Sequence, residues 1–325
     1  GSEIPVNRRL TSSQKCIRTN DIESVGDNTH HTFFEMLGNF SVGDYFKDEA
    51  IEMAFELLTN EKYFGFPLEK LYITVYKNDD EAYDKWIKMG VDPTHLVRLE
   101  SNFWEIGEGP CGPDSEIFYD RGIEYDKDNL GIKLLQDEID NSRYVEIWNN
   151  VFSQFNSKEG LKRDEYPELP SKNIDTGMGL ERMACIIEGV ESSYDTDLFR
   201  KTINKIEELS NKKYNNDKEF RIIADHIRTL TFAIADGAVF SNEGRGYVIR
   251  RLLRRSVRYG HDIGIPGKFM SDIVPSVVET MKNYYPELET KKEYIQGIID
   301  KEEELFQKTL VSGEKKLNEM LEKAK

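Results

Sequence analysis

The chain has 325 residues, a length typical of two domains, and its 38% hydrophobic residues with 23 glycines suit a folded core. Its 44 basic and 60 acidic residues give a net charge of −16, which excludes polyanion binding over the whole surface, so any nucleic-acid contact needs a local basic patch. Three scattered cysteines exclude a disulfide scaffold, and no apolar run reaches the ~18 residues of a membrane span. We therefore expect a cytoplasmic protein without membrane contact.

The first half of the sequence predicts a mixed α+β domain. Short β-prone runs at residues 71–76 and 144–148 alternate with glycine-containing loops, and residues 48–58 have the apolar spacing of a helix that faces a sheet. Glycine and proline crowd into residues 107–113, a density that predicts a shaped loop instead of a helix or a central strand.

The second half predicts an all-helical domain. Long helical periods begin near Tyr194, and the polar, turn-prone residues 188–193 precede them. We therefore predict one domain over residues 1–193 and a second over 194–325. The expected helices cover residues 198–209, 220–240, 246–259, 269–284 and 292 to the C-terminus.

An arginine and two phenylalanines near the N-terminus suit nucleotide binding. Arg18 lies on one arm of an expected hairpin, and Phe33 and Phe34 lie on the other. A guanidinium can bind a phosphate while a phenyl ring stacks on a base, and strand alternation turns only one of the two rings toward a ligand. A solvated arginine and two core phenylalanines are the alternative interpretation.

A second nucleotide-type pattern occupies residues 173–183. A strand ends in two glycines, which let a ligand approach the backbone, and a helix then opens with Glu181 and Arg182. An ordinary strand-to-helix junction would have the same pattern.

Taken together, these segments resemble the alanyl-tRNA synthetase family, in order and in spacing, over nearly the whole chain. The resemblance implies a class II synthetase fold, with an antiparallel-sheet catalytic domain followed by an all-helical tRNA-recognition domain. It implies an alanine–tRNA ligase, which converts ATP and L-alanine to alanyl-adenylate and then transfers alanine to the 3′ end of tRNA(Ala). The segments that carry it are residues 13–18, 30–40, 109–113, 146–149, 173–182 and 241–251.

The resemblance implies a role for each residue of the ATP site. Arg18 would bind the α-phosphate, Phe34 or Phe33 would stack on adenine, and Arg182 would cover the other side of the ring and reach the γ-phosphate. Arg18, Arg182 and Asp175 would be the catalytic set. Because charge builds on phosphoryl oxygens during adenylate formation, prepositioned cations should supply most of the acceleration.

Alanine needs an anion for its ammonium group, a donor for its carboxylate and a small apolar wall for its methyl group. By similarity to the family, Asp175 takes the first role and Asn149 the second. A one-residue shift would put Asn150 in place of Asn149, and the wall residues could be ordinary core. The residues matched to this pocket are Trp104, Asn149, Val151, Asp175 and Gly177.

Magnesium is expected with ATP, held mostly by phosphate oxygens and one or two carboxylates, with Glu146 and Glu181 as candidates. The five histidines do not predict a protein-bound zinc site. His30 and His31 point to opposite sides of a strand and are expected to shape the ATP loop, His31 as an ATP contact and at least one of the two in a structural role.

The basic patch that the composition requires lies in the helix expected over residues 246–259. Arginines there recur at i, i+4 spacing and predict a cationic strip for tRNA phosphates. In the family, an asparagine matching Asn242 helps to recognise a G·U pair in the acceptor stem, although a turn-forming asparagine would look the same. The candidate tRNA-binding residues are Asn242, Arg245, Arg250, Arg251, Arg254 and Arg255.

The chain departs from the family pattern at both ends. It opens just before the second class II motif, and it ends before the editing and C-terminal domains, so we expect a monomeric fragment. An inactive truncated fragment, or a catalytically inactive tRNA-binding relative, is the alternative function. The joint presence of Arg18, Asp175 and Arg182 argues against the inactive relative, because RNA binding alone needs none of them.

Overall fold

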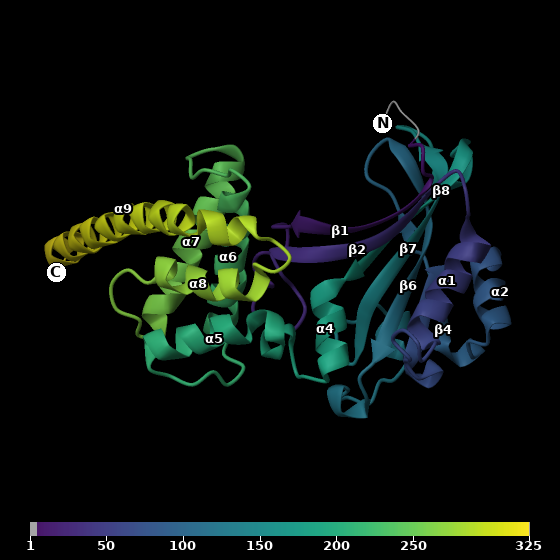
Figure 1. The fold of residues 1–325 in the computed structure, drawn as a ribbon, viewed down its shortest axis with the longest axis horizontal. Coiled ribbons are helices and arrows are strands. Elements are labelled where there is room, and N and C mark those ends of the chain that lie inside the picture. The colour runs from purple at the N-terminus through teal and green to yellow at the C-terminus, as the bar shows by residue number, and fades with distance from the viewer. Residues whose placement is uncertain (1–4, 325) are drawn as a thin grey trace. The chain divides into compact units, whose positions relative to one another are not determined.

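The computed structural model describes residues 5–324 and has the expected α+β character (Figure 1). It divides into two compact units. Within the described residues, the first unit contains residues 5–15 and 35–187, and the second contains residues 16–34 and 188–324. The second unit therefore includes a hairpin segment from the N-terminal part of the chain, which a single boundary between residues 193 and 194 does not assign to it.

A mixed, largely antiparallel sheet forms the centre of the first unit. The strand order is β1-β2-β8-β7-β6-β3-β4, with β5 paired to β6 at the side. Strands β3 and β4 are parallel, whereas β2–β8, β8–β7, β7–β6 and β6–β3 are antiparallel pairs. The strands are β1 (Arg9–Ile17), β2 (Phe33–Val42), β3 (Leu71–Tyr76), β4 (Leu96–Leu99), β5 (Phe103–Trp104), β6 (Gly109–Asp120), β7 (Tyr144–Ser157) and β8 (Glu168–Gly179).

Helices and the sheet share one apolar core in the first unit. Helix α1 (Lys47–Thr59) buries Ile51 and Leu58 in a cluster that also contains Trp148 and Met178 of the sheet. The helix expected over residues 48–58 is therefore confirmed, and so is the strand over 71–76. The other helices of this unit are α2 (Asp80–Met89), α3 (Lys133–Gln136) and α4 (Leu180–Glu188).

The loop predicted over residues 107–113 is wrong, because strand β6 begins at Gly109 and lies between β7 and β3. The glycines make this strand possible. Gly109 has φ +134°, a conformation open to glycine, and a Cβ on Gly112 would overlap the carbonyl oxygen of Phe152. A register shift between Cys111 and Asp114 accompanies this close approach.

The second unit contains the five expected helices. Their apolar faces form a second core, which includes Phe199, Ile227, Leu252 and Ile295. Helix α6 ends before residue 240, since Gly237 follows it in a left-handed conformation. Within the described residues, no helix combines the length and apolar composition that crossing a bilayer requires. The helices are α5 (Asp197–Ser210), α6 (Lys218–Ala235), α7 (Gly244–Asp262), α8 (Met270–Met281) and α9 (Glu287–Ala324).

Candidate functional site

Strand register places the residues of β7 and β8 that are expected to bind alanine on one face of the sheet. Asn149 of β7 pairs with Gly177 of β8, and the next row on this face pairs Val151 with Asp175. Directly paired residues point to the same side of a sheet, and residues two apart in a strand share a face. Asn149, Val151, Asp175 and Gly177 therefore lie together.

A β-bulge brings Glu146 onto this face as well. Between β6 and β7, Ile117 pairs with Trp148 while Phe118 pairs with Glu146, so Ile147 is an extra residue. Without that bulge, the odd spacing would turn Glu146 and Asn149 to opposite sides. The extra residue also explains why both Ile147 and Trp148 are buried in the apolar core.

The structure separates Asn149 from its neighbour Asn150. Asn149 is half-buried, and its Oδ1 has no hydrogen-bond partner among the described residues. Asn150 is buried and points to the opposite face. Of the two asparagines, Asn149 therefore shares a face with Asp175 and Gly177.

Asp175 is the carboxylate of this face on β8. It is exposed, yet partial burial from water raises the pKa of its carboxyl group above the usual value. A carboxylate in such a position can pair with an ammonium group. Trp104 lies on β5 opposite Gly112 and is also exposed, whereas Val151 is buried.

Two further carboxyl groups, neither of them among the predicted site residues, occupy the same face. Asp114 pairs with Val151, and Glu116 pairs with Asn149, so both belong to the same two rows. Burial raises the pKa of Asp114 to about 7, and burial with the neighbouring carboxylate of Glu146 raises that of Glu116 to about 8. Their alternation in the sequence was the available signal. We call Asp114, Glu116, Glu146, Asn149 and Asp175 the polar face.

Arg182 reaches the polar face from the first turn of α4. Its Nη1 donates to the carbonyl oxygen of Glu146 at 3.0 Å and to Oε2 of the same residue at 3.2 Å. About a third of each side chain remains exposed, so a ligand can reach both. A guanidinium held in this way can bind a phosphate.

The two predicted magnesium candidates differ in environment. About a third of the Glu146 side chain is exposed, whereas Glu181 is buried and its carboxylate accepts the backbone N–H of Glu35 at 3.1 and 3.2 Å. Glu181 therefore supports β2, and only Glu146 offers an accessible oxygen. Within residues 5–324, no group of three or more histidine, cysteine, aspartate or glutamate side chains is arranged to hold a metal ion.

In the second unit, Arg18 and Phe34 form the expected hairpin pair. The backbone N–H of Arg18 donates to the carbonyl oxygen of Thr32 at 2.9 Å, which joins the two arms. The guanidinium of Arg18 lies 5.3 Å from the centre of the Phe34 ring. This cation–π contact places a cation beside an aromatic ring that is not fully buried.

His31 and Phe33 do not have the accessibility that an ATP contact requires. Phe33 is buried and stacks on Phe232 with ring centres 4.2 Å apart. The side chain of His31 is only 3% exposed, and its two ring nitrogens contact Asp225 and Ser193. The expectation that these residues touch ATP is therefore corrected, because both are interior residues of the second unit.

The arginines of α7 do not form a uniform cationic strip. Arg250 pairs with Glu302 at 2.6 Å, Arg254 lies over the Phe306 ring, and Arg255 contacts His226. In contrast, Arg245 and Arg251 are exposed. Interior contacts therefore occupy three of the five candidate arginines.

Asn242 precedes α7 and is exposed. Its Oδ1 accepts a hydrogen bond from Nη1 of Arg250 at 2.5 Å. Guanine recognition through this oxygen would share the acceptor with Arg250.

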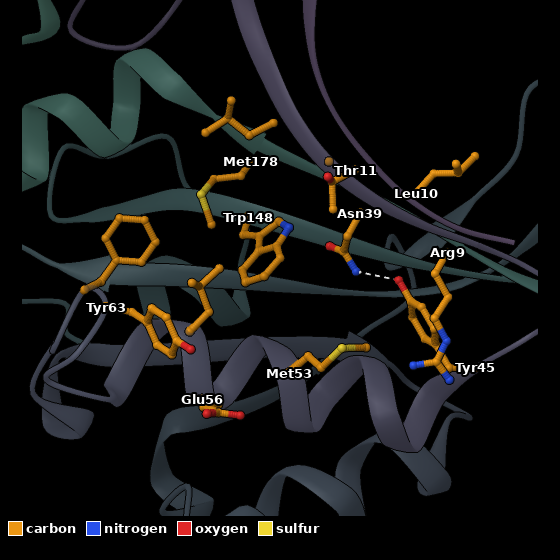
Figure 2. Close-up of a pocket in the computed structure, with 14 residues that line it drawn as sticks. Arg9, Leu10, Thr11, Asn39, Tyr45, Met53, Glu56, Tyr63, Trp148 and Met178 are labelled. Carbon is orange, nitrogen blue, oxygen red and sulfur yellow. Dashed lines mark hydrogen bonds between the residues drawn. The ribbon is translucent and has the colours of Figure 1, made fainter. Parts of the chain in front are cut away.

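A cavity of about 590 Å³ lies in the first unit, on the side of the sheet opposite the polar face. Trp148 and Met178 line it from the sheet, while Met53 and Glu56 line it from α1 (Figure 2). Since Trp148 and Met178 adjoin Asn149 and Gly177 along their strands, they point away from the predicted alanine residues. The cavity therefore does not belong to the polar face.

Comparisons with known proteins agree with these features. The family described as "tRNA synthetases class II (A)" matches residues 1–325. The alanine–tRNA ligase of Lactococcus lactis subsp. cremoris (strain MG1363) is 59% identical over 99% of this chain and 37% of the relative. That of Streptococcus thermophilus (strain ATCC BAA-491 / LMD-9) is 56% identical, with the same coverage. The chain thus spans little more than a third of the length of these relatives.

Proposed function

Because the chain belongs to the class II tRNA synthetase family, we propose that it carries the aminoacylation core of an alanine–tRNA ligase. The observation that supports this most directly is the register of β7 and β8, where an asparagine, an aspartate and a glycine share one face. The 59% identity to an alanine–tRNA ligase agrees with it. The substrates would be ATP, L-alanine and the acceptor stem of tRNA(Ala).

In the proposed reaction, the polar face binds alanine. Asp175 pairs with the ammonium group, Asn149 donates to the carboxylate, and Val151 with Trp104 encloses the methyl group. The lack of a Cβ on Gly177 lets the substrate approach the backbone. These contacts orient one carboxylate oxygen of alanine for attack on the α-phosphorus of ATP.

Cationic side chains stabilise the phosphoryl charge that develops during the attack. Arg18 binds the α-phosphate while Phe34 stacks on adenine, and Arg182 serves the adenine ring and the γ-phosphate. The alanine carboxylate forms a bond to phosphorus, and pyrophosphate leaves. A ribose hydroxyl at the 3′ end of the tRNA then attacks the alanyl carbonyl carbon, and AMP departs.

Magnesium bound to ATP would neutralise part of the phosphate charge. Of the two expected carboxylates, Glu146 fits such an ion, because it offers an accessible oxygen on the polar face. Glu181 does not fit, since its carboxylate is buried on the Glu35 backbone.

For RNA, we propose contact through the exposed residues at the start of α7. Arg245 and Arg251 would bind phosphates, and Asn242 would recognise the G·U pair of the acceptor stem through its side-chain amide. Arg250 would orient Asn242 through the hydrogen bond to Oδ1.

The proposed activity is tested by ATP–pyrophosphate exchange with alanine, serine, glycine or no amino acid. We expect the fastest exchange with alanine. Asp175→Asn removes the charge that pairs with the ammonium group, so kcat/KM for alanine should fall by about 100-fold or more. The matched control is Glu168→Gln, which alters an exposed carboxylate at the other end of β8. Equal exchange in all three proteins would contradict the assignment of Asp175, and no exchange by the folded chain would favour an inactive fragment.

A further inference from the structure

A buried carboxylate on α6 binds the end of the protein hairpin that carries Arg18 and Phe34. Oδ1 of Asp225 accepts the backbone N–H of Thr32 at 2.9 Å, and Oδ2 accepts the Thr32 hydroxyl at 2.5 Å. Oδ1 also lies 3.1 Å from Nδ1 of His31. One carboxylate thus fixes two consecutive residues directly before Phe33 and Phe34.

The carboxylate of Asp225 is ionised in this position. Burial alone would raise its pKa, but hydrogen bonds from His226 and His31 outweigh burial and hold the pKa well below the usual value. A buried charge of this kind is costly unless its donors stay in place. The network therefore favours one arrangement of the hairpin residues.

His226 connects Asp225 to helix α7. Its Nδ1 lies 2.8 Å from Oδ2 of Asp225, and its Nε2 lies 3.1 Å from Nη1 of Arg255. Arginine can only donate, so Nε2 must accept, and Nδ1 must carry the proton that it donates to Asp225. A neutral histidine satisfies both contacts, in agreement with burial, which lowers the pKa of His226.

Arg255 faces the interior, unlike a typical phosphate-binding arginine. Its side chain is 10% exposed, and its guanidinium also lies 3.8 Å from Glu23. Arg251, one turn earlier, pairs with the same glutamate at 2.7 Å. Helix α7 thus contacts the segment between Arg18 and Phe34 directly through Glu23 and indirectly through His226.

Short contacts connect this network to the residues proposed to bind ATP. The carbonyl oxygen of Thr32 accepts the backbone N–H of Arg18, and Arg228 of α6 donates to the carbonyl oxygen of Phe33 at 3.3 Å. Phe34 therefore directly follows a residue that α6 holds, and Arg18 is hydrogen-bonded to Thr32, which α6 also holds.

We propose that Arg255, His226 and Asp225 are positioning residues that hold the Arg18–Phe34 hairpin to α7, the helix proposed to contact RNA. Arg255 acts through His226 and does not itself bind RNA. The functional consequence rests on the proposed function: displacement of α7 would move the nucleotide-binding residues. The structural link itself can be tested without any substrate.

The first test measures hydrogen exchange of the ligand-free chain by mass spectrometry. Arg255→Met removes the donor to His226, so the amides of residues 28–34 should exchange about tenfold faster. Arg255→Lys retains a donor and should restore most of the protection. Arg258→Met, on an exposed position of the same helix, removes the same charge without touching His226 and should leave residues 28–34 unchanged.

His226→Asn provides a second variant, in case Arg255→Met does not fold. Asparagine can keep the donor to Asp225 but loses the acceptor for Arg255, so exchange at residues 28–34 should again increase. Equal exchange at these residues in Arg255→Met, His226→Asn and Arg258→Met would overturn the proposal.

The second test measures the Kd of ATP with Mg²⁺ by calorimetry. Arg255→Met should weaken ATP binding by about fivefold, while Arg258→Met should not. In pyrophosphate exchange, KM for ATP should rise and KM for alanine should stay the same. If hydrogen exchange at residues 28–34 becomes faster in Arg255→Met while its ATP affinity is unchanged, the positioning role is overturned. If the wild-type chain fails to bind ATP, the proposed function fails, while the exchange result still supports the link to α7.

Discussion

At the scale of single residues, the polar face is defined by how strongly each carboxyl group is removed from water. Asp114 is 4% exposed and accepts one hydrogen bond, from Nδ2 of Asn102 at 2.8 Å. Asp175 is exposed and keeps its charge more easily. Burial raises the pKa of Asp114 to about 7, so about half of its carboxyl groups retain the proton at neutral pH, which lowers the negative charge beside Asp175.

The raised pKa of Asp114 makes stability depend on pH. Between the usual pKa of an aspartate and a pH of about 7, the carboxyl group of Asp114 is ionised in the unfolded chain but still protonated in the folded chain. The free energy of unfolding therefore falls as pH rises through this range. In the wild type, this effect should lower the free energy of unfolding by about 2 kcal/mol between pH 5 and pH 8, and we expect the decrease to be absent in Asp114→Asn. Urea unfolding at both pH values measures this.

The control for that experiment is Asp128→Asn, which alters an exposed carboxylate. The control should follow the wild-type pH dependence. If Asp114→Asn shows the same slope as the wild type, Asp114 is ionised in the folded chain and the interpretation fails.

Strand alternation alone does not decide between Asn149 and Asn150. The resemblance to the family selects Asn149, and the register places Asn149 in one row with Gly177, beside the row of Asp175. Strand alternation does not decide which of Phe33 and Phe34 faces a ligand, and only the packing of Phe33 on Phe232 distinguishes the two rings. The i, i+4 spacing of the α7 arginines does not reveal that Glu302 and His226, which are distant in sequence, turn two of them inward.

At the scale of elements, β6 shows how a strand can contain residues that usually break strands. Composition predicts a loop over residues 107–113 because local propensity ignores the neighbouring strand. Here the approach of the Phe152 backbone leaves no space for a side chain at residue 112. Tertiary packing therefore selects glycine at this position and overrides its low strand propensity.

This packing predicts a clear difference between two glycine substitutions. Gly112→Ala should lower the free energy of unfolding by about 2 kcal/mol or more, because the new methyl group meets backbone that cannot move easily. Gly297→Ala on α9 meets no atom within 4 Å and should stabilise the chain by up to about 1 kcal/mol. Thermal unfolding of both variants checks this. Equal effects would show that the Phe152 carbonyl is not a barrier.

At the scale of the whole molecule, the net charge of −16 opposes RNA binding. Binding must then depend on a few exposed cations and should weaken steeply with salt. The two units each have their own core, and residues 16–34 belong to the second. Composition cannot assign this hairpin, because the contacts that hold it come from residues between 193 and 255. The monomeric state and recognition of the G·U pair stay predictions.

The salt dependence gives a test of the RNA surface. With an acceptor-stem hairpin RNA, we expect the logarithm of the binding constant to fall linearly with the logarithm of salt concentration. Arg251→Met should reduce that slope by about one, the value for one phosphate contact. Lys201→Met, an exposed cation on α5, should leave the slope unchanged. Identical slopes in all three proteins would remove Arg251 from the RNA surface.

The extra residue, Ile147, shifts the alternation of side chains along β7 by one position. Before it, an even-numbered residue, Glu146, faces the polar side, and after it the odd-numbered Asn149 and Val151 do. Parity along the strand is therefore inverted at one position. A deletion of Ile147 would leave Glu146 and Asn149 two residues apart, and regular alternation would then keep both on the polar side without a bulge. If Ile147 instead stayed and the bulge were straightened, the odd spacing would place the partner of Arg182 and the proposed alanine donor on opposite sides of the sheet.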